Sequence, residues 1–324
     1  MSASPPTSAT SGTQTAVAAG VLCYLIWGFI PLAFQQMGHH GATPWEIMAN
    51  RAVWGVLWAL LLVLLAKQWG QTLSILRNPR TLGWLVLSAG IIAGNWIIYI
   101  LAVNSGRTLD ASLGYYLNPL LNMAAGAWIF RERISGSGKI AMGLAAVGVA
   151  VQTVALGHAP WVSLGLATTF AAYGIIRKRV QADAQTGLFI ECLILTLPGI
   201  LYMAWLQQTG QAHFMATPAA TLWLLFAGPV TVIPLMLFSW AARRMPLSSM
   251  GFLQFLAPTI VFFIGLSQGE PLNTLRIVSF VFIWAAVGVF IYGAVTSARR
   301  RHDAPIAAEC EPGLVEDIDN VNRR

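Results

Sequence analysis

Charged side chains are scarce in this sequence. Asp, Glu, Lys and Arg make up 10% of the 324 residues, whereas hydrophobic residues make up 56%. An ordinary soluble domain carries about one charged residue in four, so this composition excludes a soluble fold of any size. The net charge of +7 does not indicate nucleic acid, because the cations lie at the ends of apolar segments, where they set topology and contact anionic lipid.

Cysteines and catalytic motifs are also sparse. Cys23 and Cys192 lie in apolar segments and Cys310 in a polar tail, so the thiols do not suggest a disulfide framework. There is no His-Glu-x-x-His or Gly-x-Ser-x-Gly motif, and Gly138-Lys139 lacks the glycine five residues before Gly138 and the Ser or Thr after Lys139 that a phosphate-binding loop has. We expect no metal, no cofactor, no enzymatic activity and no ATP hydrolysis by this chain.

Both ends of the chain are polar. Residues 1–14 contain no Lys or Arg, so they lack the basic start of a cleavable signal peptide and are predicted to be a disordered cytoplasmic arm. Residues 298–324 become polar and acidic and are predicted to be a disordered cytoplasmic tail.

Between these ends, apolar stretches of membrane-spanning length follow one another. A span needs about 20 mainly apolar residues to cross the hydrocarbon core, and about ten stretches meet that criterion. They are predicted at 15–37, 45–66, 81–104, 110–130, 139–157, 161–177, 187–207, 219–242, 247–267 and 272–296.

The cations alternate between the connections. The outward connections hold only Arg107 and Arg276, whereas the inward ones hold Lys67, Arg77, Arg80, Arg131, Arg133, Lys139, Arg177, Lys178, Arg179, Arg243, Arg244, Arg299, Arg300 and Arg301. This positive-inside pattern predicts a multi-pass protein of a bacterial inner membrane with both termini in the cytoplasm and membrane lipids as partners.

A weak internal repeat divides the chain. Residues 145–149 read Ala-Ala-Val-Gly-Val and recur at 285–289, and each copy follows a mid-span proline (Pro119; Pro258) and a loop glutamate (Glu132; Glu270). The halves are 15–157 and 158–297. Since five spans is an odd number, the second half enters from the opposite face, as in many secondary transporters. The predicted fold is all-α and integral to the membrane, with ten transmembrane helices in two inverted five-helix repeats.

Short motifs along residues 17–297 carry a family resemblance. Among them are Tyr24-Leu25-Ile26-Trp27-Gly28, Gly94-Asn95-Trp96, the stretch 111–120, Pro258-Thr259 and Gly269-Glu270. The sequence resembles the RarD proteins of the EamA family, within the drug/metabolite transporter superfamily. The resemblance implies ten helices in two inverted halves and an exporter-like carrier, and it names no substrate. Asn50, Asp110 and Arg131 depart from the pattern, and the first of these changes the polar lining of the second span.

Polar side chains inside the spans are the candidates for substrate binding, because hydrocarbon forces such groups to find partners or water. Arg51 lies roughly 10 Å along its span, where it either faces a cavity and binds an anionic group or snorkels to the interface. Tyr115, Asn118 and Asn122 form one helical stripe. The predicted substrate-binding residues are Trp27, Arg51, Asn95, Trp96, Tyr115, Tyr116, Asn118, Asn122 and Gln254, with helix packing as the alternative role of Asn95.

Prolines and acids complete the candidates. Pro119 and Pro258 are predicted to be helix breaks beside the substrate, with ordinary kinks as the alternative. Glu191, about one turn into its span, either carries a proton or pairs with a cation of the 177–179 cluster. Glu46 is predicted to be a first-turn acid and Asp110 an N-cap.

These features predict a secondary transporter, an exporter or exchanger, of a small amphipathic or zwitterionic metabolite or drug. The substrate would cross through a central cavity by alternating access. The alternatives are a lipid-modifying membrane enzyme, which needs a cluster of acid, base and nucleophile, and a non-transporting sensor, which needs a folded output segment. A homodimer is left open.

Overall fold

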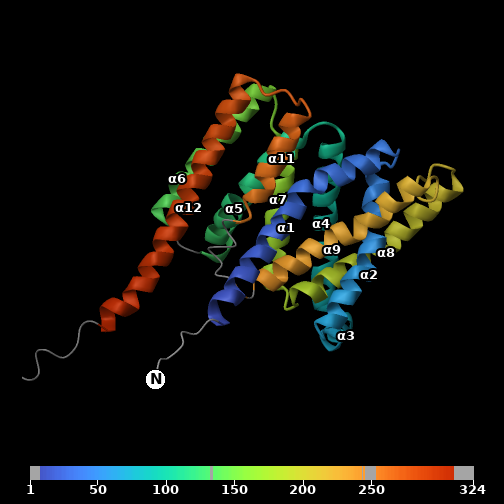
Figure 1. Ribbon diagram of the computed structural model, residues 1–324, viewed down its shortest axis with the longest axis horizontal. Coiled ribbons are helices and arrows are strands. Elements are labelled where there is room, and N and C mark those ends of the chain that lie inside the picture. The colour runs from blue at the N-terminus through green and yellow to red at the C-terminus, as the bar shows by residue number, and fades with distance from the viewer. Residues whose placement is uncertain (1–7, 132–133, 243, 245–252, 310–324) are drawn as a thin grey trace, which may run out of the picture.

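The computed structural model describes residues 8–131, 134–242, 244 and 253–309, and every regular element in them is a helix (Figure 1). This confirms the all-α prediction for the described residues. The helices are α1 (Ser8–His39), α2 (Pro44–Leu65), α3 (Trp69–Leu76), α4 (Pro79–Asn104), α5 (Thr108–Phe130), α6 (Gly136–Leu156), α7 (Trp161–Arg179), α8 (Ala184–Gln208), α9 (Pro218–Ala242), α11 (Leu256–Ser267) and α12 (Thr274–Glu309).

Seven of the ten predicted spans agree with a helix to within three residues at each end. The first and last spans lie in helices that extend further, and 247–267 is described as a helix only from Leu256. Two predictions about the ends of the chain were wrong. Residues 8–14 belong to α1 and residues 298–309 to α12, so these parts of the expected arm and tail are helical. A span provides a formed helix onto which each further residue adds without a new nucleation step. Residues 1–7 and 310–324 lie outside the described part of the chain.

Seven helices in the described residues are long and apolar enough to cross a membrane by length and composition. Large apolar side chains such as Leu65, Leu197 and Leu222 lie exposed on their outer faces. A surface of this kind suits lipid rather than water, because a soluble protein seldom exposes wide apolar patches. The chain is therefore a multi-pass membrane protein.

Local capping explains where several helices begin and end. The side chains of Thr43, Asn78 and Ser135 accept backbone N–H groups at the starts of α2, α4 and α6. Such caps satisfy amides that have no partner inside the helix. Gly157 ends α6 with a φ of 71°, a left-handed conformation that glycine adopts without a steric penalty.

The helix pairs form a regular pattern. The helix α1 packs against α9 and α11, and α7 packs against α4 and α5. In the same way α2 contacts α9, and α8 contacts α4. In these contacts α7 corresponds to α1, α8 to α2, α4 to α9 and α5 to α11. The remaining extensive pairs are α2 with α8, α5 with α11 and α6 with α12. Figure 1 shows α6 and α12 side by side at one edge of the bundle.

The buried apolar residues gather in separate clusters rather than one core. One cluster lies between α1, α2, α4 and α9 and includes Phe34, Met48, Tyr99 and Leu224. Another joins α5, α6, α11 and α12. The candidate site lies in the first cluster, beside the buried side chain of Arg51 on α2.

Candidate functional site

Arg51 lies among aromatic rings in the interior of the bundle. Its side chain extends from α2 and is 8% exposed. Its guanidinium carbon Cζ is 3.9 Å from the centroid of the Trp96 ring on α4 and 5.4 Å from that of Phe34 on α1. These are cation–π distances. The side chain does not snorkel to a helix end, which was the alternative interpretation of this residue.

No anionic side chain in the described part of the chain pairs with Arg51. Its Nε atom is buried and has no hydrogen-bond partner. Glu46, the nearest acid on the same helix, is bonded elsewhere. An unpaired charge in an apolar interior is costly, and ion pairing or a bound anion removes much of that cost. Among the described residues the guanidinium therefore has no anionic partner.

Two further rings, those of Tyr99 and Tyr115, belong to the same packed cluster as Phe34 and Trp96. The rings of Phe34 and Tyr99 are 6.2 Å apart between centroids, and those of Tyr99 and Tyr115 are 5.3 Å apart. In the described residues neither tyrosine hydroxyl has a hydrogen-bond partner. The sequence pattern indicated Tyr115 but not Phe34 or Tyr99. Tyr99 follows Trp96 by three residues, and this spacing places both on one helix face.

The other aromatic candidates, Trp27 and Tyr116, contact other rings. Trp27 is half-buried on α1, with its ring 5.3 Å from that of Tyr24 and 6.0 Å from that of Phe238. The Tyr116 ring is stacked against that of Phe255 at 6.4 Å. Tyr116 therefore packs between α5 and α11 and not beside the Arg51 guanidinium.

The amide candidates differ in their hydrogen bonds. Asn95 donates from Nδ2 to the Leu166 carbonyl (2.9 Å) and to Thr169 Oγ1 (2.8 Å), so it joins α4 to α7, which is the packing alternative. Asn118 is buried on α5, and its Oδ1 has no partner. Gln254 is half-buried in the turn before α11. The side chain of Asn122 lies outside the described residues.

The two prolines behave differently. Pro258 lies in the first turn of α11, where its missing N–H leaves no broken hydrogen bond. The helix α5 continues through Pro119, so the break predicted there was wrong. Loss of one backbone hydrogen bond is tolerated where neighbouring helices support the span. Ser112 and Tyr116 on α5 hydrogen-bond to the Pro258 carbonyl (2.8 Å) and to Thr259 Oγ1 (2.7 Å).

Glu191 is buried where α4, α7 and α8 meet. Its carboxylate accepts hydrogen bonds from Ser88 Oγ (2.6 Å) and the Tyr173 hydroxyl (3.2 Å), and Arg177 Nε lies 3.9 Å away. Gly187 makes room for this cation, because a Cβ there would lie 1.9 Å from Arg177 Nη1. This geometry matches the ion-pair alternative for Glu191.

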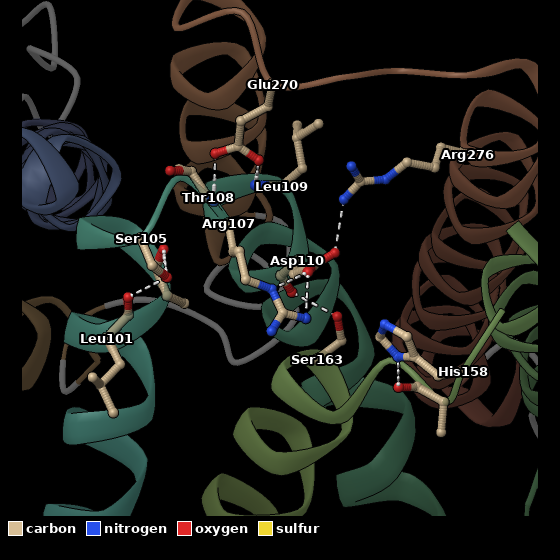
Figure 2. A network of polar contacts seen from close by, with 12 residues as sticks. Leu101, Ser105, Arg107, Thr108, Leu109, Asp110, His158, Ser163, Glu270 and Arg276 are labelled. Carbon is tan, nitrogen blue, oxygen red and sulfur yellow. Dashed lines mark hydrogen bonds and ion pairs between the residues drawn. The ribbon is translucent and has the colours of Figure 1, made fainter. Parts of the chain in front are cut away.

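A second polar network lies where α5 begins, as Figure 2 shows. Asp110 accepts from Arg276 Nη2 (2.8 Å) and from Arg107 Nε (2.9 Å). Glu270 accepts the backbone N–H groups of Thr108 and Leu109. The prediction that Asp110 caps its own helix was wrong, because a carboxylate from the α11–α12 connection satisfies these first amides of α5.

We call the end of the bundle that carries Glu270 the Glu270 end. Hydrogen bonds at this end also join segments that lie far apart in the sequence. Glu46 accepts from His213 N (2.7 Å), His213 Nδ1 (2.9 Å) and Phe214 N (3.0 Å). Gln35 and Gln268 exchange amide hydrogen bonds of 3.0 and 2.7 Å. Beside this pair a cavity of about 390 Å³ is lined by Gln35, Gln36, His39, Asn104 and Gln268, among others. Glu46 is the first-turn acid of α2, as predicted.

The opposite end, here called the α3 end, carries its own polar contacts. Gln68 Nε2 donates to Asp183 Oδ2 (2.8 Å), and Thr186 Oγ1 donates to Gln68 Oε1 (3.0 Å). Both bonds join the connection after α2 to the start of α8. Each end of the bundle is thus held by hydrogen bonds between the two parts of the chain.

Comparison with known proteins supplies a family. Residues 14–154 match the profile of the EamA-like transporter family. An uncharacterized transporter of Pseudomonas aeruginosa is 41% identical over 295 residues, covering 90% of this chain and 98% of its own. Protein RarD of Streptomyces exfoliatus is 39% identical (89% and 91% covered), and protein RarD of Escherichia coli 35% (89% and 97%). One crystal structure, named simply as that of a protein, aligns with 87% of this chain over 98% of its own length. The TM-score is 0.57 and the sequence identity 18%, which indicates a shared fold.

Proposed function

The chain belongs to the EamA family, alongside RarD proteins of the drug/metabolite transporter superfamily, and we propose that it is a secondary transporter of a small amphipathic molecule. Relatives named as transporters, together with the apolar helices, support a membrane transporter. We propose in addition a substrate site, a transport mechanism and an orientation in a bacterial inner membrane.

The observation that carries the proposal is the unpaired guanidinium of Arg51 inside the bundle. Buried ionisable groups in membrane helices are costly and are commonly functional. A substrate that brings an anionic group would compensate this charge, while Phe34, Tyr99 and Tyr115 would contact its apolar part. Arg51 is therefore assigned to substrate binding.

The pairing of the helices supports two inverted repeats of five. If α1, α2, α4, α5 and α6 are matched in order with α7, α8, α9, α11 and α12, the extensive contacts of one set map onto those of the other. A structure of two similar halves has two related packings, one open to each side of the membrane. Alternating access through a central cavity is the mechanism proposed.

Polar contacts between the halves support closure at both ends. At the Glu270 end Glu46 binds His213, and Gln35 binds Gln268. At the α3 end Gln68 binds Asp183, and Ser88 binds Glu191. Opening either end requires one set of these hydrogen bonds to break while the other holds. The carrier then works as an exporter or an exchanger, according to the gradients that it meets.

The test is transport by the full chain reconstituted in lipid vesicles. Pools of amphipathic organic acids, amino acids and drugs are offered, and uptake is measured by mass spectrometry of the vesicle contents. We expect saturable uptake of at least one compound by the wild type and none by Arg51→Gln. Arg77→Gln, which removes an exposed cation after α3, should retain uptake. Equal uptake by wild type and Arg51→Gln for every compound contradicts the proposal.

A further inference from the structure

If the proposed function holds, the charge of the substrate can be inferred from the buried charges of the protein, by asking which of them lack a partner. The buried charged side chains of the described residues are Glu46, Arg51, Asp110, Glu191, Glu270 and Arg276. All except Arg51 are held by hydrogen bonds or ion pairs within the chain. The interior therefore contains one unused cation and no unused carboxylate among these residues.

The two acids closest to the site along α2 and α8 are already bonded. Glu46 accepts two backbone amides and the His213 ring, and Glu191 accepts two hydroxyl groups beside Arg177. An ammonium group on a substrate would have to displace these partners. A zwitterion or an organic cation thus meets no free anionic partner among the buried side chains that the structure describes.

The rings beside Arg51 also disfavour a cation. The face of an aromatic ring can bind an ammonium group, but the Trp96 face already holds the guanidinium at 3.9 Å. A second positive charge near this ring would be repelled by Arg51, and the low local dielectric strengthens that repulsion. The aromatic rings near Arg51 therefore suit an uncharged, apolar part of a substrate.

A guanidinium that lies over a ring can still donate hydrogen bonds. Its N–H groups lie in the plane of the guanidinium, so when one face rests on Trp96 the N–H groups still point sideways, toward an in-plane acceptor. Arginine binds a carboxylate through two parallel hydrogen bonds of this kind. A single guanidinium balances one negative charge, whereas a dianion would bring a second charge with no partner.

We infer that the Arg51 site selects monoanionic organic acids with an apolar, preferably aromatic, body and rejects zwitterions and cations of the same shape. The acid group binds the guanidinium edge, and the body lies against Phe34, Tyr99 and Tyr115.

The experiment measures binding to the purified full chain by isothermal titration calorimetry. The four probes share one ring and a similar chain length: 3-phenylpropanoate (anion), 3-phenylpropanamide (neutral), phenylalanine (zwitterion) and phenethylamine (cation). We expect 3-phenylpropanoate to bind at least tenfold more tightly than the others. In Arg51→Gln the anion should lose at least tenfold in affinity and the amide should change little; Arg77→Gln is the matched control for loss of one positive charge.

Tighter or equal binding of phenylalanine or phenethylamine overturns the inference, and so does failure of 3-phenylpropanoate to bind. Equal affinity of wild type and Arg51→Gln for the anion removes Arg51 from the site. This outcome can be told apart from a failure of the proposed function. Selective binding of the anion without uptake would support the inferred selectivity and contradict transport. Arg51-dependent uptake of a zwitterion would support transport and contradict the inferred selectivity.

Discussion

Arg51 is the eighth residue of α2 and Glu191 is the eighth residue of α8, so two buried charges of opposite sign occupy corresponding positions in these helices. The two helices pack against each other. If they enter the membrane from opposite faces, each charge lies roughly 10 Å from its own side. Among the described residues Glu191 has hydrogen-bonding partners, whereas Arg51 contacts aromatic rings and has no anionic partner. The corresponding positions in the two helices therefore differ in their chemistry.

The first prediction concerns the affinity of the site. Arg51→Lys keeps the charge but loses the planar fork of N–H donors, so it should weaken binding of a carboxylate substrate by about tenfold, near 1.4 kcal/mol. Apparent affinity and membrane abundance are measured together. If lysine binds the anion as tightly as arginine, the paired hydrogen bonds are not part of recognition.

The second prediction concerns stability. Arg51→Met removes an unpaired buried charge and should raise the free energy of unfolding by roughly 1–3 kcal/mol. Arg276→Met is the matched control, because Arg276 is buried but paired with Asp110 at 2.8 Å; its loss should lower stability. Urea-dependent unfolding in detergent gives both values. A less stable Arg51→Met variant would show that the charge has a structural partner.

A third prediction tests the close approach of α2 and α9. A Cβ at Gly228 would lie 2.7 Å from the backbone carbon of Trp54, and backbone moves less readily than a side-chain end. Gly228→Ala should therefore destabilise the bundle by about 1–3 kcal/mol. Gly90→Ala on α4, where no atom lies within 4 Å of the new Cβ, should unfold like the wild type. Equal thermal unfolding of both variants contradicts this packing.

The fourth prediction concerns the Glu270 end. Cysteines at Gln35 and Gln268 in a cysteine-free background, joined by a short bis-methanethiosulfonate cross-linker, should hold α1 and α11 together and stop uptake. A reductant should restore uptake, because it cleaves the cross-link. Each single-cysteine variant should transport with or without the reagent. Undiminished uptake by the cross-linked protein would mean that these helices do not separate during transport.

The fifth prediction tests the topology that the alternating cations indicate. Single cysteines at His40, Gly157 and Gly269 should react with an impermeant maleimide applied outside intact cells. Cysteines at Gly70, Ser137 and Gln181 should react only after the membrane is opened. The reverse pattern of labelling would overturn the expected orientation of both termini.

Helix positions could be predicted from the sequence because they depend on local properties. Span length and apolar composition located the helices, and the capping residues Thr43, Asn78 and Ser135 lie within three residues of the amides that they accept. Errors arose where local signals conflict. Pro119 suggested a break that neighbouring helices prevent, and Asp110 suggested a cap that Glu270 supplies from 161 residues away.

The sequence by itself determined a multi-pass helical membrane protein and its family, because hydrophobicity, positions of charge and short motifs are written in consecutive residues. Only the tertiary structure decided which polar groups remain unpaired. Glu46 is bonded to His213, 167 residues away, and Glu191 to Ser88, 103 residues away. Within the described part of the chain, Arg51 contacts aromatic rings and no carboxylate. Partner choice depends on which helices pack together, and that packing is a property of the whole chain.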